Sequence, residues 1–190
     1  MGTRHLIAVQ VDGEYKVAQY GQWDGYPSSQ GVSILAFLRN ADLAKFSAKV
    51  RATRFLTEAE LKAITGADWK RRFPHLSRDA GSAILHMVMN ADDGIALKND
   101  IDFAADSLFC EYAYVIDLDT KKLEVFRGFN TTGQEKGGRF SNLPFEQKHR
   151  GENQYYPVTK LCEFDLANLP SDADFLKVAE PEDEEEEEEA

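Results

Sequence analysis

The chain has 190 residues, 43% of them hydrophobic, and a formal net charge of −11. This length suits one domain with its own hydrophobic core. Nine acidic residues lie within residues 180–190, and removing their charge from −11 leaves only −2 for the rest of the chain. A nearly neutral body without a broad basic face argues against nucleic-acid binding. We therefore predict a single domain over residues 1–179, followed by a disordered acidic tail over residues 180–190.

The cysteines and the hydrophobic pattern indicate the compartment. Cys110 and Cys162 are far apart and belong to no CxxC pattern, which argues against a disulfide framework or a zinc site. No stretch approaches the roughly 18 consecutive apolar residues of a membrane span, and the first residues do not form a signal peptide. We expect a cytoplasmic protein that contacts no membrane and uses no cofactor or metal ion. Nothing in the pattern predicts an oligomeric state.

The first elements form a predicted hairpin. Residues 4–11 are mainly apolar, Asp12-Gly13 makes the turn, and residues 14–22 return as the second strand. An Asp-Gly pair between apolar runs is a strong hairpin signal. Because residues 6–9 are apolar at every position, both faces of the first strand are expected to be covered.

Helical patterns then occupy residues 32–94. Residues 32–40 carry apolar side chains at helical spacing, and Asp42 is placed to cap a second helix. Thr57 and Glu60 have the spacing of a capping box. A basic connector is expected at residues 69–74. Another helix is expected to open at Ser77 or Asp79.

The second half of the chain alternates strands with polar segments. Residues 95–109 are expected to be irregular, and residues 130–153 to form a mobile loop. Three further strands are expected at residues 110–116, 123–129 and 158–165. This order of hairpin, helices, hairpin and strand predicts an α+β fold with a layered, mainly antiparallel sheet and helices.

Residues 19–31 are the most unusual segment. The run QYGQWDGYPSSQG holds three glycines, three aromatic residues, one carboxylate and three amides, whereas a plain connector needs only small polar residues. Its glycines permit positive φ and close backbone approach. Two interpretations are open: a structural turn whose aromatic residues plug the end of the sheet, or a ligand or substrate site. We expect residues 3–5 to lie beside the Trp23 indole and the Asp24 carboxylate.

The beginning of the chain has a resemblance to a known superfamily. Gly2-Thr3, an apolar strand, Asp12-Gly13 and a second strand ending in QYGQ resemble the start of N-terminal-nucleophile hydrolases, with proteasome-type subunits the nearest case. The order of elements is similar over about two thirds of the chain. The resemblance implies a related layered fold and hydrolysis of an amide or amidine, with Thr3 as nucleophile and its own α-amine as base. This requires cleavage before Thr3, and Lys16 does not match the lysine usual beside the nucleophile.

A second resemblance involves the same segments. GTRHL at residues 2–6 and AQYGQWDGYP at residues 18–27 resemble a family of uncharacterised proteins from phages, bacteria and fungi, which implies no activity. The alternative function is therefore non-catalytic binding of a small molecule or a partner protein, for example by a phage accessory or inhibitor protein. The expected binding residues are Arg4, His5, Gln19, Tyr20, Gln22, Trp23, Asp24 and Tyr26.

Weaker candidates lie elsewhere in the chain. Asp100, Asp102 and Asp106 could hold a divalent cation, although a solvated loop is the simpler interpretation. Residues 70–72 are basic and could contact phosphate, but three charges are a weak signal. The acidic tail could bind a basic partner.

Overall fold

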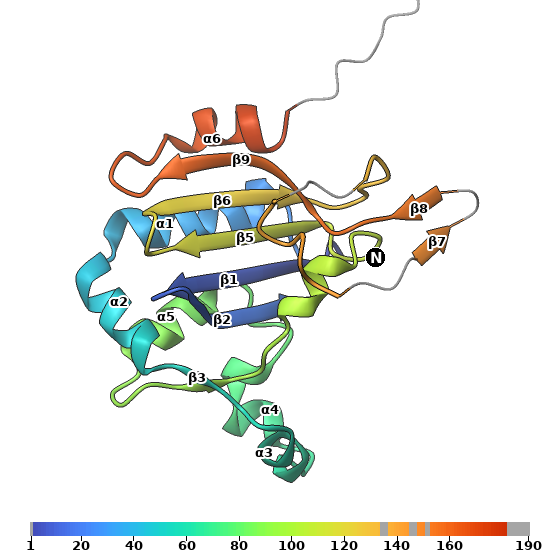
Figure 1. Cartoon of the computed structure of the whole chain (residues 1–190). Coiled ribbons are helices and arrows are strands. Elements are labelled where there is room, and N and C mark those ends of the chain that lie inside the picture. The colour runs from blue at the N-terminus through green and yellow to red at the C-terminus, as the bar shows by residue number, and fades with distance from the viewer. Residues whose placement is uncertain (1, 134–136, 145–147, 151–152, 182–190) are drawn as a thin grey trace, which may run out of the picture.

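The computed structural model describes residues 2–133, 137–144, 148–150 and 153–181. Its centre is a five-stranded sheet in the order β2-β1-β5-β6-β9 (Figure 1). The strands are β1 His5–Val11, β2 Glu14–Gly21, β5 Tyr112–Asp117, β6 Lys122–Arg127 and β9 Thr159–Asp165. Strand β1 pairs with β5 in parallel, and the other neighbouring pairs are antiparallel. The sheet is therefore mixed, and the predicted α+β class is confirmed.

The helices gather mainly on one face of this sheet. Helices α1, α2 and α5 lie on its far side in Figure 1, while α6 runs along β9 at the edge. The helices are α1 Val32–Asn40, α2 Leu43–Ala52, α3 Glu58–Ala63, α4 Trp69–Arg72, α5 Ala83–Asn90 and α6 Asp172–Ala179. The minor strands are β3 Arg54–Phe55 beside β4 Ala96–Leu97, and β7 Lys148–Arg150 beside β8 Asn153–Tyr155.

Local sequence signals explain several of these boundaries. Asp12 and Gly13 both have positive φ, 54° and 76°, as a tight hairpin turn requires. The Asp42 side chain accepts a hydrogen bond from the Lys45 backbone N–H at 2.9 Å. Thr57 and Glu60 form the predicted capping box.

Two segments of the structure differ from the prediction. Residues 69–72 form the short helix α4 and not a connector. Helix α5 begins at Ala83, later than predicted, because residues 77–82 form turns, in which the Ala80 N–H donates to the Ser77 carbonyl and the Ala83 N–H donates to the Ala80 carbonyl.

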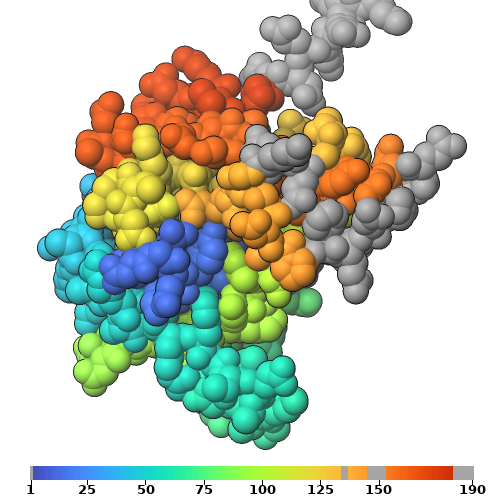
Figure 2. Space-filling view, viewed as in Figure 1, coloured from blue at the N-terminus to red at the C-terminus, as the bar shows by residue number. Residues whose placement is uncertain are grey.

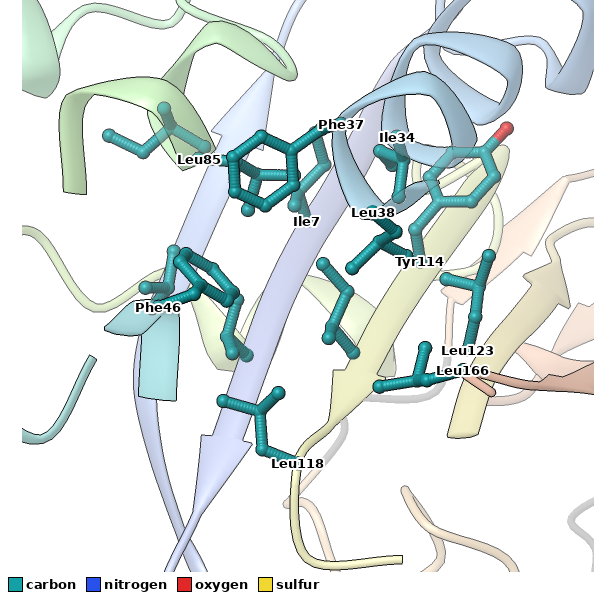
Figure 3. Close-up of a cluster of buried hydrophobic side chains, with 14 of the residues drawn as sticks. Ile7, Ile34, Phe37, Leu38, Phe46, Leu85, Tyr114, Leu118, Leu123 and Leu166 are labelled. Carbon is teal, nitrogen blue, oxygen red and sulfur yellow. The ribbon is translucent and has the colours of Figure 1, made fainter. Parts of the chain in front are cut away.

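The helix side of the sheet holds the larger hydrophobic core. Ile7 and Val9 of β1 are fully buried there, against side chains from α1, α2 and α5. Figure 3 shows Phe37 of α1, Phe46 of α2 and Leu85 of α5 gathered over the strands. A fully buried side chain of this size contributes roughly 1.5–3 kcal/mol to stability. This packing fixes the helices on the sheet.

The other face of the sheet, termed the open face because no α-helix of the described chain covers it, has a smaller core. Leu6 and Ala8 of β1 are fully buried there with Cys110, Phe126 and Phe140. Figure 2 shows segments from the middle and later parts of the chain, coloured yellow-green and orange, lying over this face. The prediction that both faces of the first strand are covered is confirmed, and the second cover is made by the 3-10 helix Ile101–Ala105 and by irregular segments.

A buried charge network attaches one of these segments. The Arg139 guanidinium donates hydrogen bonds to Glu124, Asp117 and Gln10. Burial alone would raise the pKa of the Asp117 carboxyl, but the Thr120 backbone N–H and the Arg139 guanidinium outweigh it and the pKa is lowered. Arg139, which lies within the expected mobile loop of residues 130–153, is thus bound to the sheet.

Several expectations involve residues that are not described. Residues 134–136, 145–147 and 151–152 of the expected mobile loop lie outside the described residues, as do residues 182–190 of the expected tail. Glu180, assigned to the tail, accepts a hydrogen bond from the Ser28 backbone N–H at 2.8 Å. Within the described chain, the helices are all too short or too polar to span a bilayer.

Candidate functional site

The first residues and the loop after β2 lie side by side, as expected. The Gly25 backbone N–H donates a hydrogen bond of 3.0 Å to the Thr3 carbonyl. A Cβ added to Gly2 would lie 2.2 Å from Cε3 of Trp23, so the indole packs directly on the backbone there. Asp24 is exposed and has the left-handed φ of 55°, which is uncommon for a residue other than glycine. The two segments therefore form one end of the sheet.

The glycines of this loop serve close approach and not positive φ. Gly21, Gly25 and Gly31 lie outside the positive-φ region. A Cβ on Gly21 would lie 2.2 Å from Cε1 and Nε2 of His5, and one on Gly25 would lie 2.9 Å from the Cβ of His5. In the same way, a Cβ added to Gly31 would lie 2.8 Å from the Phe175 ring. The three glycines are therefore explained by close packing of the backbone against buried rings.

His5 occupies the space that these glycines leave. Its residue exposure is 1%, and neither ring nitrogen makes a hydrogen bond to the described part of the chain. Burial lowers the pKa of His5 to about 4, although the nearby Thr3 carbonyl opposes this shift. The imidazole is therefore neutral at pH 7. Because it is neutral and inaccessible, His5 acts as a packing residue rather than as a proton-transfer group.

Strand alternation divides the expected site residues between two faces. In the β1–β2 register, Gln19 is opposite Ile7, on the helix side, whereas Tyr20 is opposite Leu6, on the open face. Gln19 is 3% exposed, and its side chain donates a hydrogen bond of 3.0 Å to the Ser77 carbonyl. His5 shares the helix side with Gln19, and Thr3 is buried next to it at 5% exposure. The nine expected residues therefore do not form one site.

Two aromatic residues of the loop, Trp23 and Tyr26, are about half exposed, and Gln22 beside them is partly buried. The Trp23 indole N–H donates a hydrogen bond of 3.1 Å to Asp79, and its side chain is 48% exposed. Tyr26 is 47% exposed and lies 6.1 Å from the Tyr112 ring. Gln22 accepts a hydrogen bond of 2.5 Å from the Tyr20 hydroxyl. They form a rim at this end of the sheet.

A pocket of about 580 Å³ opens on the other face, termed here the β1–β2 end pocket. Two of the expected binding residues, one from the start of β1 and one from the end of β2, line it together with residues of the 98–109 segment. The lining residues are Arg4, Tyr20, Lys98, Asn99, Asp100, Asp102, Phe103, Asp106 and Phe109.

The walls of this pocket are held in place by contacts within the chain. The Tyr20 and Phe103 rings meet edge to face, with centroids 4.8 Å apart. The Arg4 guanidinium lies 4.6 Å from the centroid of the Phe109 ring and forms an ion pair of 3.7 Å with Glu111. The aromatic and charged groups are thus positioned before any ligand arrives.

The 98–109 segment reaches the pocket by pairing with the edge of β2. Asn99 bridges to Ala18, and the Asp100 backbone N–H donates a hydrogen bond of 3.0 Å to the Ala18 carbonyl. The Asp100 carboxylate accepts a hydrogen bond of 3.2 Å from the Tyr20 backbone N–H. Sequence reasoning missed this wall. Its signal was the alternation of aspartates with apolar residues, which was interpreted as a solvated loop, with a divalent-cation site as the weaker alternative.

The structure does not group these aspartates as metal ligands. Within the described residues, no cluster of three His, Cys, Asp or Glu side chains is placed to hold a metal ion. Asp100 instead forms an ion pair of 2.5 Å with Lys98.

A second hollow of about 610 Å³ lies beside Arg139 on the open face. Its charged groups pair with one another: Arg139 with Glu124 and Asp117, and Lys160 with Glu124. The Tyr15 hydroxyl also accepts from Arg139, at 3.4 Å. This hollow is the surface of the network that attaches residues 137–144, and its polar groups are already occupied.

Comparisons of the chain with protein families, with curated proteins and with solved structures found no match. The two resemblances noted in the sequence therefore stay predictions. Function is inferred from the geometry of the site alone.

Proposed function

We propose that the protein binds a small molecule, without transforming it, in the β1–β2 end pocket. The observation that carries this proposal is the pocket itself, about 580 Å³ and walled by three aromatic rings with charged groups at its edge. Small-molecule sites typically measure about 300–1,000 Å³ and combine apolar walls with a few polar groups. A site whose walls are already fixed loses little conformational entropy on binding.

The chemistry around the pocket favours binding over catalysis. The buried His5 lies on the opposite side of the strand and is not a lining residue. The Asp100 carboxylate is engaged by Lys98 and by the Tyr20 N–H. Neither group is free to move protons for a substrate in the pocket, and the exposed Asp102 carboxylate has no second group positioned beside it for acid–base chemistry among the described residues. Cys110 and Cys162 are both free thiols, which fits our proposal of a cytoplasmic protein.

The test is a fragment screen by two-dimensional NMR on the full chain, with small neutral and charged fragments at millimolar concentration. Binding in the pocket shifts the backbone amide signals of Tyr20, Asp100 and Phe103. Phe109→Leu removes an aromatic wall and lowers affinity by about two- to tenfold, since stacking on such a ring is worth roughly 0.5–1.5 kcal/mol. Trp23→Leu is the matched control, because it removes another exposed aromatic ring that does not line the pocket.

Two outcomes contradict the proposal. Either no fragment shifts those three amides, or fragments bind equally well to the wild type and to Phe109→Leu. If the fragments instead shift the amide signals of Trp23 and Tyr26, the alternative function, binding of a partner protein, is favoured. Binding of a partner protein is supported by these two half-exposed aromatic side chains.

A hydrolase of N-terminal-nucleophile type is the second candidate. Its support is the position of Thr3, at the start of β1 and hydrogen-bonded through its carbonyl to Gly25. Thr3 is 5% exposed and does not line the β1–β2 end pocket, so substrate access would require this end of the sheet to rearrange. Intact mass decides the question. A purified chain that keeps Gly2 has no free α-amine at Thr3 and cannot follow this mechanism.

A further inference from the structure

The charges around the β1–β2 end pocket are unequal. Three carboxylates line it, from Asp100, Asp102 and Asp106, against two cations, from Arg4 and Lys98. Both cations already have carboxylate partners: Arg4 pairs with Glu111, just behind the lining, and Lys98 pairs with Asp100. Counted over the lining residues alone, the three carboxylates and two cations give a formal charge of −1.

Asp102 is the carboxylate best placed to meet a ligand. Its side chain is exposed at the pocket, and it forms no hydrogen bond or ion pair with another described residue. Asp100, by contrast, accepts from the Tyr20 N–H and is largely buried. A charged ligand group can pair with Asp102 without displacing an existing contact.

One cation–aromatic contact already exists in the pocket, and a cationic ligand could make contacts of the same kind. The Arg4 guanidinium lies over the face of Phe109, with its central carbon 4.6 Å from the ring centroid. Aromatic faces attract cations through their negative quadrupole, by about 0.5–2 kcal/mol depending on exposure. Tyr20 and Phe103 add further aromatic surface on the facing wall.

We propose that the ligand is a small organic cation whose uncharged part is planar or apolar. This inference rests on the proposed binding function. Its amine, amidine or guanidine group pairs with Asp102, and its body packs against Tyr20, Phe103 and Phe109. An anion of the same size meets the unpaired carboxylate and is disfavoured by like-charge repulsion.

Three probes of one shape and different charge test this inference. Benzamidine is a cation, benzamide is its neutral counterpart, and benzoate is the anion. Each is titrated into the full chain at low salt, and the shifts of the Tyr20, Asp100 and Phe103 amides give its dissociation constant. Benzamidine is expected to bind about three- to fivefold more tightly than benzamide, the effect of one exposed ion pair, and benzoate most weakly.

Two variants assign the charge preference to its residue. Asp102→Asn is expected to reduce the advantage of benzamidine over benzamide to less than about twofold. Asp93→Asn removes an exposed carboxylate from the turn after α5, away from the lining residues, and leaves that advantage intact. Sodium chloride at about 0.5 M weakens benzamidine binding and leaves benzamide binding unchanged.

The outcomes separate this inference from the function on which it rests. Equal affinities for the three probes, or a preference for benzoate, overturn the cation inference and leave the pocket as a binding site. A benzamidine preference that survives in Asp102→Asn overturns the assignment to that residue. If no probe shifts the three amides, while the NMR fragment screen finds ligands that do, only the cation inference fails. If neither experiment moves these amides, the binding function fails as well.

Discussion

The two faces of the sheet differ most at the end where β1 begins. On the helix side, His5 and Gln19 are almost completely buried, and glycine backbone closes over the imidazole ring. On the open face, the neighbouring residues Arg4 and Tyr20 line a pocket that reaches solvent. One step along a strand reverses the direction of the side chain. Consecutive residues of one motif can thus have opposite roles, one in packing and one in recognition.

The two faces are also covered by different kinds of interaction. The helix side is covered by amphipathic helices packed through apolar side chains. The segment over the open face is attached by the buried Phe140 ring and also by polar groups, among them Arg139 and Asn130, which donates to the Pro157 carbonyl at 2.9 Å. Substitutions on the helix side should therefore change stability through side-chain volume, whereas on the open face loss of charge should also change stability.

The largest change in the free energy of unfolding is expected from removing the Arg139 charge, which binds the segment around it to the open face. Arg139→Met leaves the carboxylates of Asp117 and Glu124 buried without their main cation, which costs about 3–5 kcal/mol of unfolding free energy. Urea denaturation measures this change. Lys160→Met is the control: its side chain is 38% exposed, and the loss should stay below about 1 kcal/mol. Equal losses for both variants would mean that Arg139 does not anchor this face.

The next effect concerns pH and belongs to the helix side. The unfolded chain protonates His5 with an ordinary pKa of 6.5, whereas burial lowers its pKa to about 4 in the folded state. Stability is therefore complete above pH 6.5 and falls by roughly 3 kcal/mol as the pH drops from 6.5 to 4. Denaturation at several pH values measures this slope.

His5→Leu should flatten the slope, since leucine does not titrate. Partial burial also lowers the pKa of His75, so His75→Gln is a matched control that removes a smaller part of the slope. If His5→Leu retains the wild-type pH dependence between pH 6.5 and 4, the imidazole is not held neutral as described.

A smaller loss is expected from filling the space beside that ring. Gly21→Ala places a Cβ 2.2 Å from the His5 imidazole and costs about 2 kcal/mol through overpacking. In the His5→Ala background the same substitution should cost much less, because the clash is gone. Gly13→Ala, whose Cβ meets no neighbour within 4 Å, should cost roughly 1 kcal/mol through its positive φ alone, in either background.

The smallest effect is expected at the pocket itself. Asp102→Asn should change the unfolding free energy by less than about 0.5 kcal/mol, because this exposed carboxylate has no partner among the described residues. The same urea experiment measures it. A loss above 1 kcal/mol would show that Asp102 stabilises the fold, which would weaken its assignment as a ligand-binding group.

Local features of the fold were accessible from the sequence. The Asp12-Gly13 turn, the cap at Asp42 and the capping box at Thr57 depend on residues within four positions of one another. The double burial of β1 followed from its unbroken apolar run. These signals are short-range, and the corresponding backbone geometry has few alternatives.

The site was only partly accessible, for reasons of distance along the chain. Thr3–His5 and Trp23 were correctly placed together, because a hairpin fixes that neighbourhood. The wall around Phe103 arrives from about 80 residues away through pairing with β2, and no local pattern encodes that contact. Arg4 and His5 face opposite ways because side chains alternate along a strand, but which face receives each of them depends on how the sheet packs against the helices, and that is not visible in the motif.

The parallel pairing of β1 with β5 has a consequence for synthesis in the cell. Residues 22–111 separate the β1–β2 hairpin from the β5–β6 hairpin, yet these two units meet in the middle of the sheet. A ribosome adding about 5–20 residues per second leaves the inner border of the first hairpin uncovered for roughly 5–20 seconds. During that interval an apolar strand with unpaired backbone groups invites association with other nascent chains. The growing polypeptide is thus a natural client for chaperones that shield such borders until the second hairpin emerges.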